Sequence, residues 1–306
     1  MQFVFIINPA AGKDNSEKDL LIQLEKKKDL DYVLYYTKSA KDATSYVREL
    51  LKNNSDKYYC FVACGGDGTI NEVINGMVGY DNCCFTVYPC GSGNDYVKYF
   101  GGADKFLNLD ELVNGREVKV DVMQVADKYS VNVVNFGFDC VVLKTMEKVK
   151  RKFLIGGKNA YTTGIAKAIF TGMKNYCQIY ADGKLLNPSG EYMLCTIANG
   201  SHVGGSYNCA PRSLIDDGYM EVYLASSMSI LKFASLVGKY KNGLHLDGDK
   251  FKDVITYTRA KKVELIAPKE MEISIDGEIA VDKHFVIENH NKILSFLAPA
   301  SFKDKQ

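Results

Sequence analysis

The chain is 306 residues long, and its 38 Lys and Arg residues nearly balance its 37 Asp and Glu residues, which gives a formal net charge of +1. With 46% apolar and 25% charged residues it has the composition of a globular protein with a sizeable core, which excludes a disordered or fibrous chain. The near-zero charge argues against a nucleic-acid partner, because phosphate-driven binding needs an excess of Lys and Arg. We expect one large domain or two ordinary ones.

The first third of the chain alternates short apolar runs with amphipathic segments. The sequence predicts strands at residues 3–7, 32–36, 58–63 and 85–88, and helices at 16–28, from about 40 and from about 69. In the last of these helices the apolar side chains recur at i, i+3, i+4 and i+7. This alternation is typical of a parallel sheet covered by helices. It predicts an open α/β domain over residues 1–121.

After about residue 121 the pattern changes to short β-like runs separated by Gly, Asn or Asp turns. We predict strands at 131–136, 178–180, 193–198, 220–225, 263–266, 271–275 and 285–287, and helical stretches near 140–150, 159–174 and 229–240. These elements predict a second, mostly antiparallel, sandwich-like domain over residues 122–290. A final strand at 293–297, within a segment at 291–306, is predicted to return to the first domain.

The nine cysteines and four histidines show neither a disulfide framework nor the spacing of a zinc site, which favours reduced, buried thiols in the cytoplasm. No apolar run approaches the ~18 residues of a membrane span. One basic and apolar stretch, Lys144 to Lys158, is a candidate for docking on anionic lipid. A solvated helix face explains the same stretch equally well.

Three glycine-bearing loops, at residues 8–13, 65–69 and 91–95, each follow a predicted strand. The carboxyl ends of parallel strands line one crevice, so these loops should converge. Glycine lets backbone N–H groups approach a phosphate, and the helix after the second loop adds its positive dipole end. Asp67 and Asp95 in these loops would repel phosphate unless Lys13 or a metal ion intervenes. The pattern predicts a polyphosphate site with Lys13 and Mg²⁺ as mediators.

The loops belong to a longer ordered set of motifs: N-P-A-A-G-K (8–13), G-G-D-G-T-I-N-E (65–72), G-S-G-N-D (91–95), N-F-G-F-D (135–139), A-P-R-S-L-I-D-D-G-Y-M (210–220) and I-D-G-E (275–278). This set resembles the diacylglycerol kinase catalytic-domain family, which also holds sphingosine kinases and soluble bacterial lipid kinases. The resemblance implies an α/β nucleotide domain like that of NAD kinases and phosphofructokinases, then a β-sandwich, with the active site between them.

The resemblance also implies which residues form the site. Those that would contact ATP are Asn8, Pro9, Ala10, Ala11, Gly12, Lys13, Thr37, Gly66, Asp67, Gly68, Thr69, Ile70, Asn71, Glu72, Ser92 and Asp95. A structural Mg²⁺ would be held by Asp217 and by the backbone carbonyls of Leu214 and Tyr219. At this turn Asp216 adds a second acid, and Arg212-Ser213 stands where the family has a small apolar pair.

Phosphoryl transfer to a hydroxyl needs an acceptor for the hydroxyl proton. The family match makes Glu278 the leading candidate, with Asp276 supporting it and Asp67 as the rival. The implied reaction moves the γ-phosphoryl group of ATP to a lipid hydroxyl, with diacylglycerol as the leading acceptor. Phosphatidylglycerol, a sphingoid base or undecaprenol as acceptor, a soluble substrate such as NAD, and a non-catalytic nucleotide-binding regulator remain open. The protein would visit the inner face of the membrane transiently, and base rates favour a homodimer.

Overall fold

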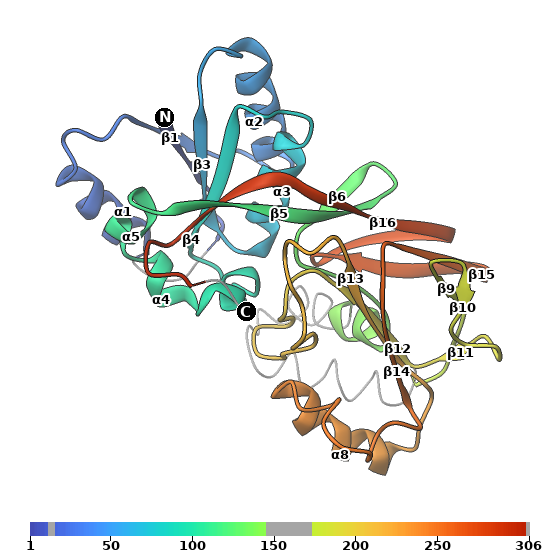
Figure 1. Cartoon of the computed structure of the whole chain (residues 1–306). Helices are drawn as coiled ribbons and strands as arrows, with labels where there is room; N and C mark the ends of the chain where they lie inside the picture. The colour runs from blue at the N-terminus through green and yellow to red at the C-terminus, as the bar shows by residue number, and fades with distance from the viewer. Residues whose placement is uncertain (12–15, 145–172, 304–306) are drawn as a thin grey trace.

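The structure of the protein is a computed structural model that describes residues 1–11, 16–144 and 173–303. Its N-terminal part is a parallel sheet with helices packed against it (Figure 1). The strands follow the order β4-β3-β1-β2. They are β1 (Gln2–Ile7), β2 (Tyr32–Tyr36), β3 (Tyr59–Gly65) and β4 (Cys83–Pro89). The helices are α1 (Ser16–Glu25), α2 (Asp42–Asn53), α3 (Asp67–Met77), the 3₁₀ helix η1 (Tyr96–Phe100), α4 (Ala103–Phe106) and α5 (Leu109–Val113).

The C-terminal part is built mostly of antiparallel strands. They are β5 (Arg116–Val125), β6 (Lys128–Ser130), β7 (Val133–Gly137), β8 (Asn175–Tyr176), β9 (Gln178–Ala181), β10 (Lys184–Leu185), β11 (Glu191–Tyr192), β12 (Leu194–Ala198), β13 (Met220–Ala225), β14 (Ile255–Ala260), β15 (Lys262–Ile275) and β16 (Glu278–Ala298). Helix α8 (Ile230–Lys241) packs on this part, as predicted for 229–240. The predicted helix near 140–150 is described only over residues 138–144, which are helical, and the one at 159–174 lies outside the described residues apart from its end.

Strand β16 joins the two parts into one 14-stranded sheet (Figure 1). Residues 278–288 of β16 pair with β15, residues 287–298 pair with β5, and Phe296 pairs in parallel with Phe85 of β4. The predicted strands at 285–287 and 293–297 are therefore one strand, interrupted by a register shift between His290 and Leu294. The predicted strands at 263–266 and 271–275 are likewise one strand, because the break after Ile266 is also a register shift. The sequence pattern cannot distinguish such an irregularity from a strand end.

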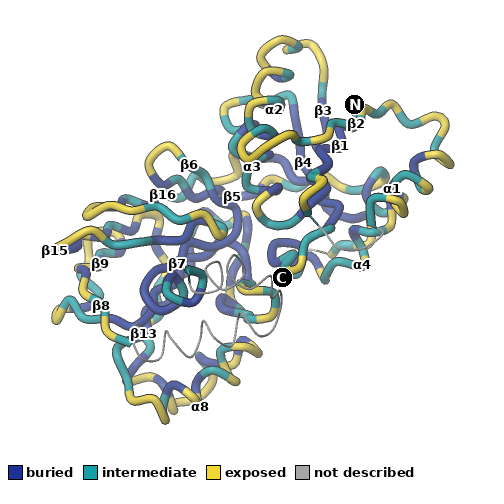
Figure 2. The backbone as a smooth tube through the Cα atoms, turned by 180° about the vertical axis from the view of Figure 1, so that it is seen from behind, coloured by how far each residue is buried: buried dark blue, intermediate teal, exposed yellow. Residues whose placement is uncertain are grey.

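Alternate residues of the C-terminal strands face two different environments, because successive side chains of a strand point to opposite faces. On β7 and β12, Val134, Phe136 and Ile197 lie in the hydrophobic core of the sandwich. Their neighbours Asn135 and Thr196 face the other side and line a cavity below α8. Figure 2 shows the buried backbone concentrated in these central strands, with exposed residues on the outer turns and along α8. The face of the sheet that carries Asn135 and Thr196, called the outer face below, is therefore one wall of this cavity.

The structure bears on the predictions about the cysteines, membrane spans and the basic stretch. All nine cysteines are free thiols, and all but Cys90 are buried, as predicted. Within the described ranges, no helix is both long enough and apolar enough to cross a membrane. Of the basic stretch from Lys144 to Lys158, only Lys144 is described, and its ammonium pairs with Glu272.

Candidate active site

The three glycine loops converge at the carboxyl ends of β1, β3 and β4. The side-chain amide of Asn8 in the first loop donates to Thr69 Oγ1 in the second (3.2 Å). The second and third loops touch through glycine backbone, since a Cβ on Gly91 would lie 2.5 Å from Gly66 Cα. No larger residue fits at Gly91 without moving one of these loops. The loops form the polar end of a cavity of about 660 Å³.

Most of the residues predicted to contact nucleotide line this cavity. They are Asn8, Ala10, Ala11, Gly66, Asp67, Gly68, Thr69, Glu72, Ser92 and Asp95. Pro9 instead faces a separate cavity of about 90 Å³, and Ile70 packs in the core with 2% of its surface exposed. Thr37 and Asn71 are not among the described residues that line the main cavity. Gly12 and Lys13 lie outside the described residues.

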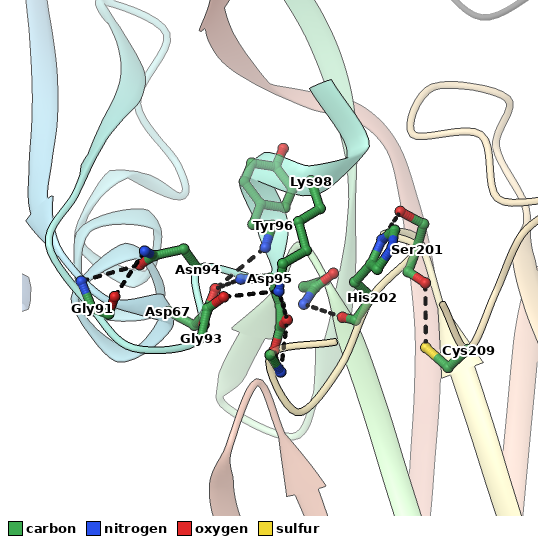
Figure 3. Close-up of polar contacts among 12 residues, drawn as sticks. Asp67, Gly91, Gly93, Asn94, Asp95, Tyr96, Lys98, Ser201, His202 and Cys209 are labelled. Carbon is green, nitrogen blue, oxygen red and sulfur yellow. Dashed lines mark hydrogen bonds and ion pairs between the residues drawn. The ribbon is translucent and has the colours of Figure 1, made fainter. Parts of the chain in front are cut away.

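Asp67 begins α3 and joins the second loop to the third (Figure 3). Its Oδ1 accepts hydrogen bonds from the backbone N–H groups of Asp95 (2.7 Å) and Tyr96 (3.3 Å). Burial, and then the charge of Asp95, raise the pKa of Asp67 to about 6. Its other oxygen, Oδ2, has no hydrogen bond with any described residue. Asp67 can therefore accept a proton near neutral pH, because its pKa is close to the working range.

Asp95 connects the loops to the C-terminal part of the chain. It is 7% exposed, and its two oxygens accept hydrogen bonds from the backbone N–H of Gly205 (3.0 and 3.1 Å). Lys98 bonds both Asp95 Oδ1 (2.5 Å) and the carbonyl oxygen of Gly93 (2.8 Å), which neutralises the buried carboxylate (Figure 3). This arrangement holds the loop around Gly205 over the polar end of the cavity.

The two carboxylates of the I-D-G-E motif have different environments. Asp276 lies in the β15–β16 turn at φ 48° and accepts hydrogen bonds from Ser130 Oγ (2.7 Å), Val133 N (2.9 Å), Asn71 Nδ2 (3.2 Å) and Val131 N (3.3 Å). Desolvation raises the pKa of Asp276, and these hydrogen bonds oppose the shift. Because Asp276 accepts four hydrogen bonds, we assign its carboxylate a role in stabilising the β15–β16 turn and not in accepting a proton. Glu278, at the start of β16, is exposed and lines the cavity.

The structure adds one carboxylate that the sequence reasoning did not assign. Asp139, at the end of the N-F-G-F-D motif, lines the cavity, and its Oδ2 is buried with no hydrogen-bond partner among the described residues. Burial alone raises the pKa of Asp139 to about 6. The motif itself was the available signal, because an Asp that follows an apolar strand and a glycine is placed where a strand ends.

Beyond these carboxylates the cavity becomes apolar. The apolar chamber lies between the outer face of the sheet and α8, and its walls are Phe138, Val142, Leu143, Met193, Leu194, Ala225, Phe233, Leu236, Val237 and Ile255. Helix α8 begins with Ser229 as its N-cap, whose side chain accepts a hydrogen bond from Lys232 N. Its cavity-facing residues recur at helical spacing, which is why one face of α8 is buried. The cavity therefore joins a phosphate-type loop cluster to a chamber suited to hydrocarbon.

The predicted structural Mg²⁺ site holds an arginine instead. The Oδ1 of Asp217 accepts a hydrogen bond from Tyr219 N (3.0 Å), and its Oδ2 pairs with the Arg259 guanidinium. Arg259 Nε also bonds Glu221 (3.1 Å), and the guanidinium lies 4.6 Å from the centre of the Tyr219 ring. Across the described part of the chain, no cluster of three or more His, Cys, Asp or Glu residues could hold a metal. Both Asp217 oxygens are engaged and its charge is matched, so these residues do not fit a resident Mg²⁺.

The chain matches two family models in sequence. The diacylglycerol kinase catalytic domain matches residues 2–125, and the YegS C-terminal NAD kinase beta sandwich-like domain matches residues 132–297. The first model covers the glycine loops, and the second covers the apolar chamber and Glu278.

Individual proteins are similar to this chain along most of their own length. A diacylglycerol kinase of Bacillus subtilis is 29% identical over 278 residues, which are 89% of this chain and 88% of that protein. A probable lipid kinase YegS-like protein of Yersinia enterocolitica is 29% identical over 287 residues, 90% of this chain and 91% of the relative. A crystal structure of a diacylglycerol kinase from Bacillus anthracis has the same fold, with a TM-score of 0.73 at 21% identity over 99% of this chain and 98% of the other. The chain therefore belongs to the diacylglycerol kinase and YegS-like family of lipid kinases, and it is a phosphotransferase.

Proposed function

We propose that the protein transfers the γ-phosphoryl group of ATP to the free hydroxyl of diacylglycerol and produces phosphatidic acid. The observation that carries this proposal is the continuity of one cavity from the glycine loops to the apolar chamber below α8. A nucleotide phosphate and a hydrocarbon chain then meet at the carboxylates between the two ends.

The nucleotide enters as its magnesium complex, which serves as substrate. The backbone N–H groups of the glycine loops and the first turn of α3 face the phosphate end, where they stabilise negative charge. The carboxylates at this end favour a nucleotide whose phosphates carry a divalent cation, because bare phosphates would be repelled. Lys13 remains a predicted phosphate ligand from the sequence.

Asp67 is the proposed proton acceptor, and Glu278 is the second carboxylate at the reacting hydroxyl. The lipid hydroxyl oxygen attacks the γ-phosphorus, the bond to the ADP oxygen breaks, and the hydroxyl proton passes to a carboxylate oxygen. The free Oδ2 of Asp67 and its raised pKa support this role. Asp276 positions the turn that carries Glu278 through its four hydrogen bonds.

A neutral acceptor lipid fits this cavity better than an anionic one. Its described lining includes Asp67, Glu72, Asp95, Asp139 and Glu278, and no Lys or Arg. A second phosphate on the acceptor, as in phosphatidylglycerol, would therefore meet like charge in a partly desolvated site. NAD would leave the apolar chamber unfilled. We infer a transient contact with the membrane surface, since the acceptor resides there.

The test is transfer of labelled phosphate from ATP to a panel of diacylglycerol, phosphatidylglycerol, sphinganine, undecaprenol and NAD, each separated by thin-layer chromatography. We expect phosphatidic acid as the main product, and transfer that is ~10³-fold slower with Asp67→Asn. The variant Asp104→Asn, which changes an exposed carboxylate of α4 away from the cavity, is the matched control and should keep wild-type activity. Faster transfer to any other acceptor would overturn the diacylglycerol assignment, and ATP binding without transfer to any acceptor would indicate a regulator.

A further inference from the structure

A row of polar residues crosses the floor of the cavity between the carboxylates and the apolar chamber. In the sheet register, Asn135 of β7 pairs with Thr196 of β12, and Thr196 pairs with Tyr223 of β13. The next row on the same face is displaced by two residues on each of these antiparallel strands, and it consists of Gly137, Leu194 and Ala225. Because each strand residue adds ~3.3 Å, the polar row and the apolar row lie ~7 Å apart.

The catalytic turn fixes the direction of this gradient. Asp276 N bonds Val133 O, so the turn that carries Glu278 lies at the Val133 end of β7. With increasing distance from this turn along β7, the cavity is lined first by the row of Asn135 and then by the row of Gly137. A lipid whose hydroxyl lies at the carboxylates therefore meets polar side chains first and apolar ones beyond them.

His245 lies against this row in an unusual state. It is 2% exposed, it lines the cavity, and neither ring nitrogen has a hydrogen-bond partner among the described residues. Its ring packs 5.4 Å from that of Tyr223 and 5.0 Å from that of Tyr240, centre to centre. Tyr240 in turn shares a hydrogen bond with Thr196 Oγ1 (3.1 Å).

Desolvation lowers the pKa of His245 to about 4, so the imidazole is neutral at pH 7, with one N–H donor and one acceptor. Leaving a buried polar group without a partner costs free energy, and buried polar groups without protein partners in a binding cavity are the groups that a ligand can satisfy. A purely structural histidine would have its nitrogens hydrogen-bonded to the protein.

We propose that His245 is a specificity residue that donates a hydrogen bond to an ester carbonyl of the acceptor lipid, at the level of the Asn135–Thr196–Tyr223 row. The inference rests on the proposed lipid kinase function and adds the recognised group. Beyond its reacting hydroxyl, a diacylglycerol presents only acceptors, and these are its ester oxygens. The first carbonyl lies a few bonds from the hydroxyl, so it falls in the polar row while the acyl chain continues into the chamber.

The test compares two acceptors that differ only in the carbonyls: dioleoylglycerol, a diester, and dioleylglycerol, the corresponding diether. Both are presented in the same mixed micelles with saturating ATP and Mg²⁺. We expect the wild-type protein to favour the diester by ~10-fold in kcat/KM, since a site built around a hydrogen bond discriminates against a substrate that cannot make it. In His245→Phe, which keeps an aromatic ring between the two tyrosines, the ratio should fall to near one.

His245→Gln retains a donor and should recover most of the diester preference, whereas a merely structural role would not depend on the donor. His284→Gln, which changes an exposed histidine on β16, is the control and should leave the ratio unchanged. Equal kcat/KM for the two lipids with wild-type protein would overturn the proposal even if no variant folds. An unchanged ratio in a folded His245→Phe would overturn it as well. Failure of the wild-type protein to phosphorylate either glycerolipid would instead refute the proposed function, and the inference with it.

Discussion

The two ends of the cavity are built by different means. The phosphate end is built mainly from main-chain N–H groups and glycines. Its functional side chains are carboxylates such as Asp67 and Asp95, which are fixed by backbone hydrogen bonds. At the chamber end, the walls are apolar side chains from strands β12, β13 and β14, from the helical residues 138–144 and from α8, with a few buried polar groups such as His245. The first end is specified by a local motif, whereas the second is specified by packing. Variants should therefore separate nucleotide chemistry from lipid recognition.

The largest effect is expected at the phosphate end. Asp67→Asn should lower kcat by ~10³-fold, because it removes the proton acceptor while its amide oxygen can still accept the bonds from Asp95 N and Tyr96 N. Glu278→Gln should also lower kcat, and comparison of the two reductions in a single-turnover assay assigns the acceptor. A larger loss in Glu278→Gln would make Glu278 the base. Unaltered circular dichroism is required of both variants.

The pH dependence of stability provides a second test of the phosphate end. The pKa of Asp67 is about 6 in the folded state, above its ordinary value. The folded state therefore binds more protons than the unfolded state between pH ~4 and ~6, and stability falls as the pH rises through this window. Asp67→Asn removes this loss, so at pH 7.5 it should be more stable than wild type by on the order of 2 kcal/mol.

Urea unfolding at pH 4 and pH 7.5 measures this difference. We expect the variant's advantage to shrink toward zero at pH 4, where Asp67 is mostly protonated in the folded protein. Activity should show the opposite trend, with kcat/KM rising through pH ~6 as the base loses its proton. An advantage that is the same at both pH values would show that Asp67 carries no such burial penalty.

At the chamber end, a smaller and more selective effect is expected. Val237 lies on α8, is half-buried and lines the cavity. Val237→Phe should raise the KM for dioleoylglycerol by ~10-fold, because the added ring occupies space that an acyl chain would fill, and ~1.4 kcal/mol of apolar burial is a tenfold effect. The KM for ATP should stay at its wild-type value. Dioctanoylglycerol should be affected less than the long-chain lipid.

Val237→Ala is the matched control for this variant, since it enlarges the chamber at the same position. It should leave the KM for the long-chain lipid within about twofold, a change expected of a minor packing loss. If Val237→Phe raised the KM for ATP and the lipid alike, the two ends would not be separable, and the comparison on which these variants rest would fail.

The difference between a locally specified phosphate end and a chamber specified by packing explains what the sequence could predict. The loops at 65–69 and 91–95 are local and follow apolar strands, so their convergence follows from the rule for parallel sheets. Membership in the lipid kinase family and the mixed fold were predicted and are confirmed. The assignments of Glu278 and of the nucleotide contacts remain predictions.

The chamber was not predictable, because its walls come from residues far apart in the chain. The same holds for the polar row beside the chamber: strand register brings Thr196 next to Tyr223, and the position of α8 brings Tyr240 to Thr196 and His245. No local spacing marks His245 as buried or unpartnered. The turn at Asp217 shows the same limit: the D-G motif is local, but the arginine that pairs with it is 42 residues later in the chain, on β14.

The smallest effect is expected at that turn, whose residues Asp217, Glu221 and Arg259 are not among those that line the cavity. Arg259 pairs with Asp217 and with Glu221, which is 2% exposed. Arg259→Gln should lower stability by ~1 kcal/mol, because a buried carboxylate loses its counter-charge while the half-exposed arginine limits the loss. Wild-type Tm should not respond to EDTA or to added Mg²⁺, whereas Mg²⁺ should stabilise the variant. Lys252→Gln, which breaks a pair exposed on both sides, should change Tm little. A drop in wild-type Tm with EDTA would show that a metal, and not Arg259, holds the turn.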